Sequence, residues 1–173
     1  MDLKHFIRDI PDFPKPGIIF KDVTPLLKNS EAFKESIGLL KRAASSWDFD
    51  LIVAPEARGF IFAAPLALEM DKGFVPIRKP GKLPYEVISK SYSLEYGEDT
   101  LEIHKDSIIP GERILIHDDL LATGGTAKAA CDLIERAGGI IVQITFIIEL
   151  SFLGGKDKFE GYTVNSLVSY GGE

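Results

Sequence analysis

Two adjacent aspartates followed by a run of small residues are the part of this sequence best suited to chemistry. Asp118 and Asp119 come directly after the apolar run 114–116, which is typical of a buried parallel strand. A helix-favouring run covers 127–136. We therefore expect a strand ending at the acids, a tight turn and a helix. The residues of the expected turn are Ala122, Thr123, Gly124, Gly125 and Thr126.

This turn has the composition of a phosphate-binding site. Its glycines let the backbone bend close to an anion, and N–H groups at the start of the helix can donate to that anion. The helix dipole adds to the attraction, and the hydroxyls of Thr123 and Thr126 provide further donors. Carboxylates do not suit a phosphate, but they suit the hydroxyl groups of a neighbouring ribose or a bound cation. The pattern therefore predicts a phosphate site beside a sugar site.

The spacing argues against two common nucleotide-binding motifs. A Walker loop requires a lysine after its second glycine, where this sequence has Thr126. A dinucleotide-binding fingerprint places its acid about 20 residues after the glycines, whereas here the acids precede them. The remaining alternative is an ordinary strand-to-helix turn with a capping threonine and two surface aspartates. Two acids at the end of a buried strand disfavour that alternative.

Composition and charge limit the class of protein. The 173 residues suit one domain, 1–173, with a substantial core, and 45% hydrophobic residues with 27% charged residues indicate a globular chain. The net charge of −6 argues against a general nucleic-acid binder, although local cations can still bind an anionic small molecule. We find no signal peptide or membrane span and only one cysteine, Cys131, so we expect a cytoplasmic protein without membrane or nucleic-acid partners.

Predicted strands and helices alternate along the chain. We expect strands over 49–54, 73–77, 114–116, 140–148 and 163–169, and helices over 2–9, 30–46, about 59–70 and 127–136, with Ser30 as the cap of the second helix. Prolines at 11, 14, 16 and 25 exclude a helix over 10–25, which we expect to be an ordered loop. The alternation predicts an α/β fold with a central, mostly parallel sheet and helices on both faces.

The segment HDDLLATGGT, residues 117–126, resembles the phosphoribosyl-pyrophosphate signature of type I phosphoribosyltransferases, in the form typical of the adenine-specific family. The resemblance covers nearly the whole chain. It implies the type I phosphoribosyltransferase fold, with an N-terminal hood over about 1–28 and a mobile β-hairpin lid over about 82–103. It also implies a homodimeric purine salvage enzyme that converts adenine and phosphoribosyl pyrophosphate into AMP and pyrophosphate. Magnesium would be held mainly by the substrate, without a direct metal site in the protein.

The resemblance assigns residues to each part of the substrate. Asp118 and Asp119 would fix the ribose, and the turn 122–126 would anchor the 5′-phosphate. PEARGF, residues 55–60, resembles the family's pyrophosphate loop, often with a non-proline cis peptide, which we place at Glu56–Ala57. The residues expected on the pyrophosphate side are Glu56, Ala57, Arg58, Arg78, Lys79 and Lys82.

The base and lid residues also follow from the resemblance. The backbone of Ile19 and Lys21 would read the adenine edge, with Phe20 near the ring and Leu150 and Leu153 as apolar walls. Residues 89–103 read as two polar strands about a turn centred on Gly97. In that hairpin, Glu95 and Tyr96 match the family's lid. The resemblance thus gives a catalytic role to Glu95, Arg58, Asp118 and Asp119.

Two other functions are compatible with the phosphate turn. A sibling enzyme for hypoxanthine or xanthine would keep the turn and change the hood. A regulator that binds phosphoribosyl pyrophosphate and acts on nucleic acid should carry a basic patch or an added DNA-binding domain. The acidity of this chain and the presence of Glu95 disfavour the regulator.

Overall fold

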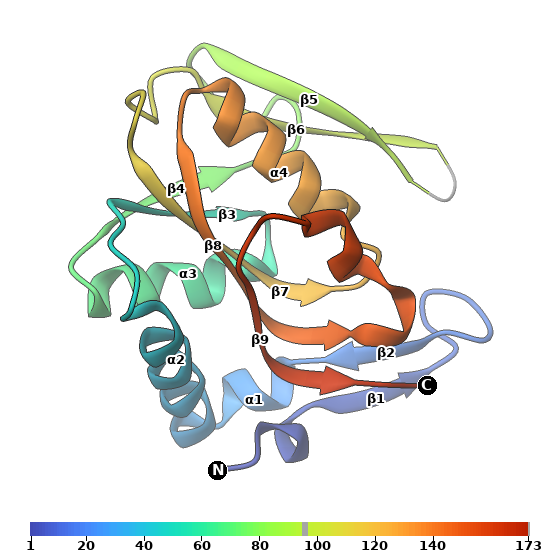
Figure 1. The fold of residues 1–173 in the computed structure, drawn as a ribbon. Coiled ribbons are helices and arrows are strands. Elements are labelled where there is room, and N and C mark those ends of the chain that lie inside the picture. Colours follow the sequence, from blue (N-terminus) through green and yellow to red (C-terminus); the bar gives the residue numbers. More distant parts are fainter. Residues whose placement is uncertain (95–96, 173) are drawn as a thin grey trace.

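A five-stranded parallel sheet forms the centre of the computed structural model, which describes residues 1–94 and 97–172 (Figure 1). The strand order is β4-β3-β7-β8-β9, and every neighbouring pair is parallel. The carboxyl ends of all five strands therefore meet at one edge, where such sheets bind ligands. The bounds are β3 (Leu51–Pro55), β4 (Gly73–Ile77), β7 (Arg113–Leu121), β8 (Ile140–Leu150) and β9 (Val164–Tyr170). The predicted α/β class with a parallel sheet is confirmed.

Two hydrophobic cores cover the two faces of this sheet. Helices α1 (Thr24–Lys28), α2 (Ser30–Ala44) and α3 (Arg58–Glu69) pack against one face, and α4 (Gly125–Arg136) packs against the other (Figure 1). Along β7, Leu115 belongs to the first core, while Ile114 and Ile116 belong to the second. All three side chains are fully buried, which explains why the strand reads as a continuous apolar run.

The hood is a β-hairpin with short helices on either side. A 3-10 helix, η1 (Leu3–Phe6), leads into β1 (Arg8–Pro11), which pairs antiparallel with β2 (Ile19–Asp22). The helix expected over 2–9 is therefore wrong beyond Phe6, because the following residues pair with β2. The segment expected as a loop contains β2 and the start of α1, which tolerates Pro25 because that residue lies in its first turn.

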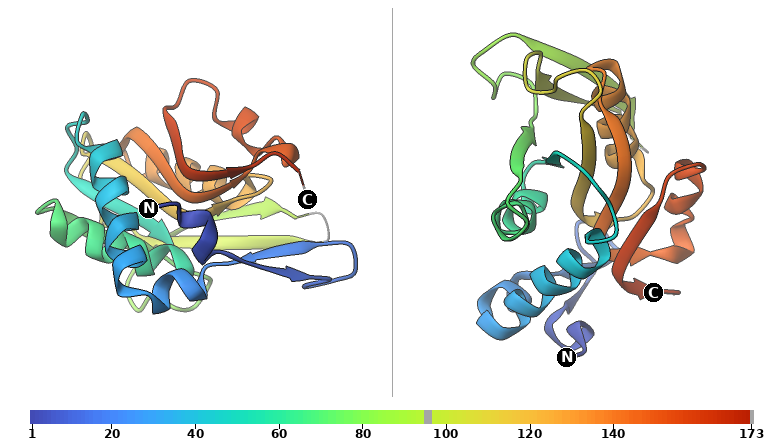
Figure 2. Two further views of the ribbon diagram at one scale, coloured as in Figure 1. Left: turned by 90° about the horizontal axis from the view of Figure 1, so that it is seen from below. Right: turned by 60° about the vertical axis from the view of Figure 1, so that its left-hand side comes forward.

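A second hairpin covers the opposite side of the carboxyl edge. Strands β5 (Val87–Ser93) and β6 (Glu98–His104) pair antiparallel, and Gly97 before β6 has a φ of +88°, as the predicted two-strand hairpin requires. Both hairpins extend in the same direction from the body (Figures 1 and 2). Glu95 and Tyr96, to which the lid roles were assigned, lie outside the described residues. The movement of this hairpin stays a prediction.

Two further sequence expectations need correction. Asn29 caps α2 in place of Ser30, because its side-chain oxygen accepts from the N–H groups of Glu31 at 3.1 Å and Ala32 at 2.9 Å. Strand β7 does not end at the two aspartates. Its pairing with β8 continues as far as Leu121 opposite Glu149, so both acids lie within the strand.

No helix among residues 1–94 and 97–172 is long and apolar enough to cross a membrane.

Candidate active site

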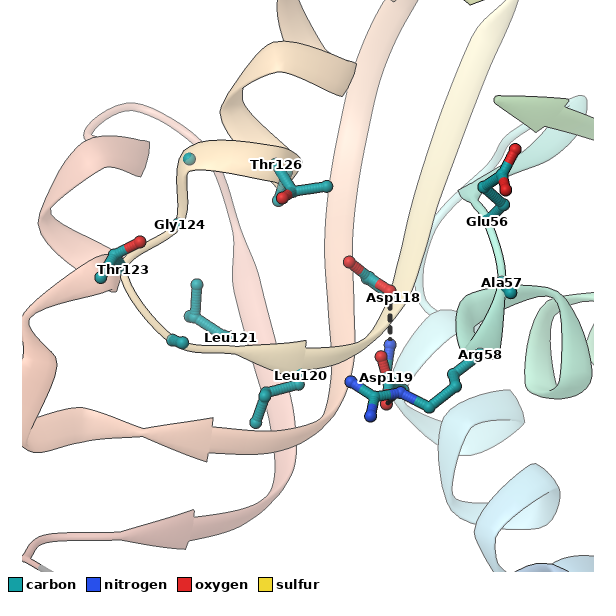
Figure 3. Close-up of a pocket in the computed structure, with 13 residues that line it drawn as sticks. Glu56, Ala57, Arg58, Asp118, Asp119, Leu120, Leu121, Thr123, Gly124 and Thr126 are labelled. Carbon is teal, nitrogen blue, oxygen red and sulfur yellow. Dashed lines mark hydrogen bonds and ion pairs between the residues drawn. The ribbon is translucent and has the colours of Figure 1, made fainter. Parts of the chain in front are cut away.

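A cavity of about 440 Å³ opens at the carboxyl edge of the sheet, between the turn after β3 and the turn after β7 (Figure 3). It contains both aspartates, the whole predicted phosphate turn and the first part of the predicted pyrophosphate loop. The lining residues are Glu56, Ala57, Arg58 and the continuous segment 118–127. Two strand–turn–helix units thus combine residues from distant parts of the sequence in one site.

The phosphate turn leaves the start of α4 open to a ligand. Gly124 has a left-handed φ of +80°, and α4 begins at Gly125 without a side-chain cap. The alternative of an ordinary turn with a capping threonine is therefore wrong. The first N–H groups of a helix have no partner within the helix, and together with the helix dipole they favour an anion.

A glycine from a separate segment packs against the backbone of this turn. Gly155 begins the 3-10 helix η3 (Gly155–Phe159), and a Cβ atom built at Gly155 would lie 2.1 Å from the carbonyl oxygen of Ala122. A Cβ at Gly124 would likewise lie 2.7 Å from the carbonyl oxygen of Gly155. The two backbones therefore pack in direct contact, and the position of the turn depends on the absence of a side chain at Gly155.

We predict that Gly155→Ala raises the KM for phosphoribosyl pyrophosphate about tenfold, because the methyl group must displace the turn and misplacement of a binding group costs affinity and rate. Steady-state kinetics with each substrate varied in turn would measure this effect. Gly171→Ala is the matched control, since a Cβ there meets nothing within 4 Å. An unchanged KM in Gly155→Ala would show that η3 does not hold the turn.

The two aspartates differ in their partners. Asp119 pairs with Arg58, whose Nε lies 2.6 Å from its Oδ2. Asp118 accepts a hydrogen bond from the backbone N–H of Asp119 at 2.8 Å (Figure 3). Burial raises the pKa of Asp118, and the charge of Asp119 raises it further. Burial also raises the pKa of Asp119, although the Arg58 guanidinium opposes that shift. The site therefore keeps a pair of carboxylates that resist being ionised together.

The Arg58 guanidinium lowers the pH at which this pair ionises, against the larger effect of burial. Because Arg58 opposes the upward pKa shift of both acids, we predict that Arg58→Gln moves the acid limb of the kcat/KM profile to higher pH. Profiles of the wild type and the variant share the titration of the substrate, so their difference reports on the enzyme. Arg42→Gln, an exposed arginine on α2, is the control. An acid limb that stays in place in Arg58→Gln would contradict this prediction.

Glu56 organises the cations expected around pyrophosphate. Its Oε1 accepts hydrogen bonds from Arg78 Nε at 3.0 Å and from the Lys79 backbone N–H at 2.7 Å. Burial alone would raise the pKa of Glu56, but these hydrogen bonds outweigh burial and hold its pKa below the usual value. Arg78 and Lys79 do not line the cavity themselves. They adjoin it through Glu56, and Lys82 follows with its N–H bonded to the Lys79 carbonyl at 3.3 Å.

The Glu56–Ala57 peptide bond is cis, as predicted for this loop.

A second, more apolar cavity of about 300 Å³ adjoins the first. We call the first the polar cavity and the second the base cavity. The hood forms one wall through Ile18, Ile19, Phe20 and Lys21, and the segment after β8 forms the opposite wall. Leu120, Ala122 and Thr123 line both cavities, so a single pair of substrates can extend across them. The predicted base residues Ile19, Phe20, Lys21, Leu150 and Leu153 all line this cavity.

Three lining residues of the base cavity were absent from the sequence predictions. Ile18 and Leu120 directly adjoin predicted site residues, and that adjacency was the available signal. Phe152, which is 39% exposed, likewise adjoins the predicted wall residue Leu153. Arg58 also contacts the hood, since its guanidinium carbon lies 5.1 Å from the centre of the Phe20 ring. Arg58 therefore connects the acid pair to the hood, and its role toward pyrophosphate stays a prediction.

Lys21 lines the base cavity and anchors the hood with its side chain. The side chain is only 4% exposed, and its Nζ lies 2.8 Å from Asp9 Oδ1. The same ammonium group lies 4.2 Å from the centre of the Tyr170 ring at the end of β9. These contacts hold β2 against β1 and the central sheet.

Comparison with known proteins agrees with this geometry. The family model of the phosphoribosyl transferase domain matches residues 22–162. An adenine phosphoribosyltransferase from Kosmotoga olearia is 63% identical over 170 residues, which cover 98% of this chain and all of that protein. The chain belongs to the adenine phosphoribosyltransferase family.

Solved structures of the family share the fold. The enzyme from Thermoanaerobacter pseudethanolicus superimposes with a TM-score of 0.96 at 56% identity, over 98% of both chains. The Saccharomyces cerevisiae enzyme, complexed with adenine and an imino-altritol bisphosphate, gives a TM-score of 0.90 at 40% identity over 96% of both chains. These matches confirm the type I phosphoribosyltransferase fold expected from the sequence.

No group of three or more histidine, cysteine, aspartate or glutamate side chains with the spacing of a metal site is found in the described part of the chain. The carboxylates of Asp118 and Asp119 nevertheless have the oxygen chemistry that magnesium prefers, and magnesium usually keeps substrate oxygens and water among its ligands. The residues present thus fit a magnesium ion that arrives with the substrate.

Proposed function

We propose that this enzyme transfers the phosphoribosyl group of phosphoribosyl pyrophosphate to adenine, giving AMP and pyrophosphate, in the two adjoining cavities. The observation that carries the proposal is the shared lining of the two cavities by Leu120, Ala122 and Thr123. It allows a phosphorylated ribose in the polar cavity to meet a planar base in the apolar one. The acid pair lies in the polar cavity, close to that junction.

The acid pair and the turn handle the phosphoribose. Asp118 and Asp119 accept hydrogen bonds from the ribose hydroxyls, and their negative charge favours the cationic character that develops at the anomeric carbon as pyrophosphate leaves. The turn 122–126 binds the 5′-phosphate through backbone N–H groups and threonine hydroxyls. Binding energy from this remote phosphate positions the reacting carbon.

The loop after β3 and the cations after β4 receive the leaving group. The backbone at Glu56–Ala57 contacts pyrophosphate, and Arg58, Arg78, Lys79 and Lys82 supply positive charge. Glu56 supports this arrangement by fixing Arg78 and the Lys79 backbone. Magnesium bound with the substrate would neutralise part of the developing charge. Glu95 and Tyr96 in the lid act on the base side, with Glu95 managing the purine proton while the closed lid excludes water.

The hood reads the base through its backbone. The carbonyl of Ile19 accepts from the amino group of adenine, and the N–H of Lys21 donates to N1. The register of the hood supports this assignment, because Ile19 and Lys21 are two residues apart on β2, so the carbonyl of one and the N–H of the other point to the same side of the strand. Phe20 and Leu150 provide apolar contacts for the ring.

The proposal extends to assembly and compartment. We place the enzyme in the cytoplasm as a homodimer. Two exposed apolar side chains on α3, Leu68 at 83% and Ile61 at 40% exposure, support the dimer. The chain has a single cysteine, Cys131, which is buried and cannot form a disulfide within the chain, as suits a reducing compartment. Light scattering would test the dimer.

A turnover assay with phosphoribosyl pyrophosphate and a panel of adenine, hypoxanthine, guanine and xanthine tests the proposed function. We expect AMP and pyrophosphate from adenine and little product from the other three bases. Efficient use of hypoxanthine or xanthine would identify the sibling activity. Binding of phosphoribosyl pyrophosphate without turnover of any base would favour the regulator.

A further inference from the structure

The first strand of the lid hairpin is fastened along the helix that begins at the phosphate turn. Strand β5 lies beside α4 (Figure 1). Lys90 Nζ lies 2.9 Å from Asp132 Oδ2, and Arg136 Nη1 donates to the carbonyl oxygen of Ser89 at 2.8 Å. Tyr92 continues this row of contacts toward the N-terminus of α4.

Tyr92 reaches the phosphate turn itself. Its hydroxyl lies 3.2 Å from the Thr126 hydroxyl, and a Cβ built at Gly125 would lie 3.6 Å from the Tyr92 ring. Thr126 lies in the first turn of α4 and lines the polar cavity (Figure 3). The hydroxyl that the 5′-phosphate needs as a donor is therefore already fixed by a residue from the hairpin.

The other neighbours of Tyr92 fix the position of its hydroxyl. The Tyr92 O–H donates to Asp99 Oδ2 at 3.2 Å, and Asp99 also pairs with the Lys79 ammonium. Asp99 Oδ1 accepts the backbone N–H of Thr100 at 2.8 Å. Asp99 therefore keeps two other donors when the Tyr92 O–H turns away from it.

We propose that Tyr92 is a positioning residue for the 5′-phosphate, which holds the Thr126 hydroxyl in the orientation that donates to the phosphate. The proposal rests on the function proposed above. When the phosphate binds, the Thr126 O–H donates to a phosphate oxygen, and the Tyr92 O–H rotates from Asp99 to donate to the Thr126 oxygen. Both protons stay on their own oxygens. A donor that itself accepts a hydrogen bond is polarised and donates more strongly.

Tyr92→Phe removes only the hydroxyl and keeps the ring on Gly125. A neutral hydrogen bond contributes about 0.5–1.5 kcal/mol, so we expect the Kd for AMP and the KM for phosphoribosyl pyrophosphate to rise about 2- to 12-fold. The KM for adenine should stay within about twofold, since Tyr92 does not line the base cavity. Calorimetric titration with AMP and steady-state kinetics measure these values. Tyr85→Phe, an exposed tyrosine just before β5, is the matched control.

A double-mutant cycle with Thr126→Val tests whether Tyr92 acts through Thr126. In the Thr126→Val background, Tyr92→Phe should change the Kd for AMP by less than about twofold. The proposal would be overturned if Tyr92→Phe raised the Kd for AMP equally in both backgrounds, or did not raise it at all. It would also be overturned if the KM for adenine rose as much as the KM for phosphoribosyl pyrophosphate. A wild-type enzyme without adenine turnover would instead refute the proposed function, so the two failures are distinguishable.

Discussion

Replacing both aspartates of the site, Asp118→Asn and Asp119→Asn, should lower kcat/KM for phosphoribosyl pyrophosphate by roughly 10²–10⁴-fold. Each carboxylate is expected to make a charge-assisted hydrogen bond to the ribose, which is worth about 1.5–3 kcal/mol, or roughly 10- to 100-fold per substitution. The asparagine oxygen at 118 can still accept the Asp119 N–H, so the local backbone geometry should persist. Wild-type kinetics in the double variant would remove both residues from the site.

Asp118→Asn alone should not weaken the fold near neutral pH. The pKa of Asp118 is higher in the folded chain than its usual value of 3.8, so the folded state favours its protonated form. Its contribution to stability is therefore present at low pH and is lost as the pH rises through the folded-state pKa. At pH 7 an uncharged asparagine should keep or raise the free energy of unfolding, measured by denaturant titration. Asp106→Asn, an exposed acid in the turn after β6, is the control for both activity and stability.

The parts of the fold that follow from local sequence were predictable. Strand β4 has the predicted bounds, Gly73–Ile77, and β9 lies within one residue of its prediction. The continuous apolar runs in β7 and β8 also mark these strands, because both lie inside the sheet and are covered on both faces. The phosphate turn was also visible, since its glycines, threonines and preceding acids are neighbours in the chain.

The hood could not be predicted as a hairpin because its prolines suppress the strand pattern. Residues Arg8–Pro11 and Ile19–Asp22 are short, partly polar segments, and each forms a strand only by pairing with the other. Their position over the cavity then depends on the Lys21 side chain, which joins Asp9 and Tyr170 from opposite ends of the sequence. No periodicity within the segment reports such contacts.

The features of the site that the sequence did not predict also arise from contacts between distant parts of the chain. Gly155 touches Ala122, and Tyr92 touches Thr126, only because separate elements pack together in the fold. The pairing of Arg58 with Asp119 likewise joins the turns after β3 and β7. The local sequence motifs predicted which residues the chemistry needs. The tertiary packing determines which other side chains hold those residues in position.

Base choice should be the most selective property of the enzyme, with adenine favoured over hypoxanthine and guanine by at least roughly 10³-fold in kcat/KM. Adenine presents an amino donor at position 6 and an acceptor at N1, which complement the Ile19 carbonyl and the Lys21 N–H. Hypoxanthine and guanine reverse both groups, so each would set acceptor against acceptor and donor against donor. Each buried group left unpaired costs about 1–3 kcal/mol.

Two substitutions at Lys21 separate its backbone from its side chain. Both Lys21→Ala and Lys21→Pro remove the ammonium that joins Asp9 and Tyr170, so both should lose activity through a loosened hood. Only Lys21→Pro also removes the N–H, and it should therefore lose most of the preference for adenine, whereas Lys21→Ala should keep it. The ratio of kcat/KM values for adenine and hypoxanthine measures this preference independently of the amount of folded enzyme. Comparable efficiency with hypoxanthine in the wild type, or a preference lost in Lys21→Ala, would show that the hood backbone does not select the base.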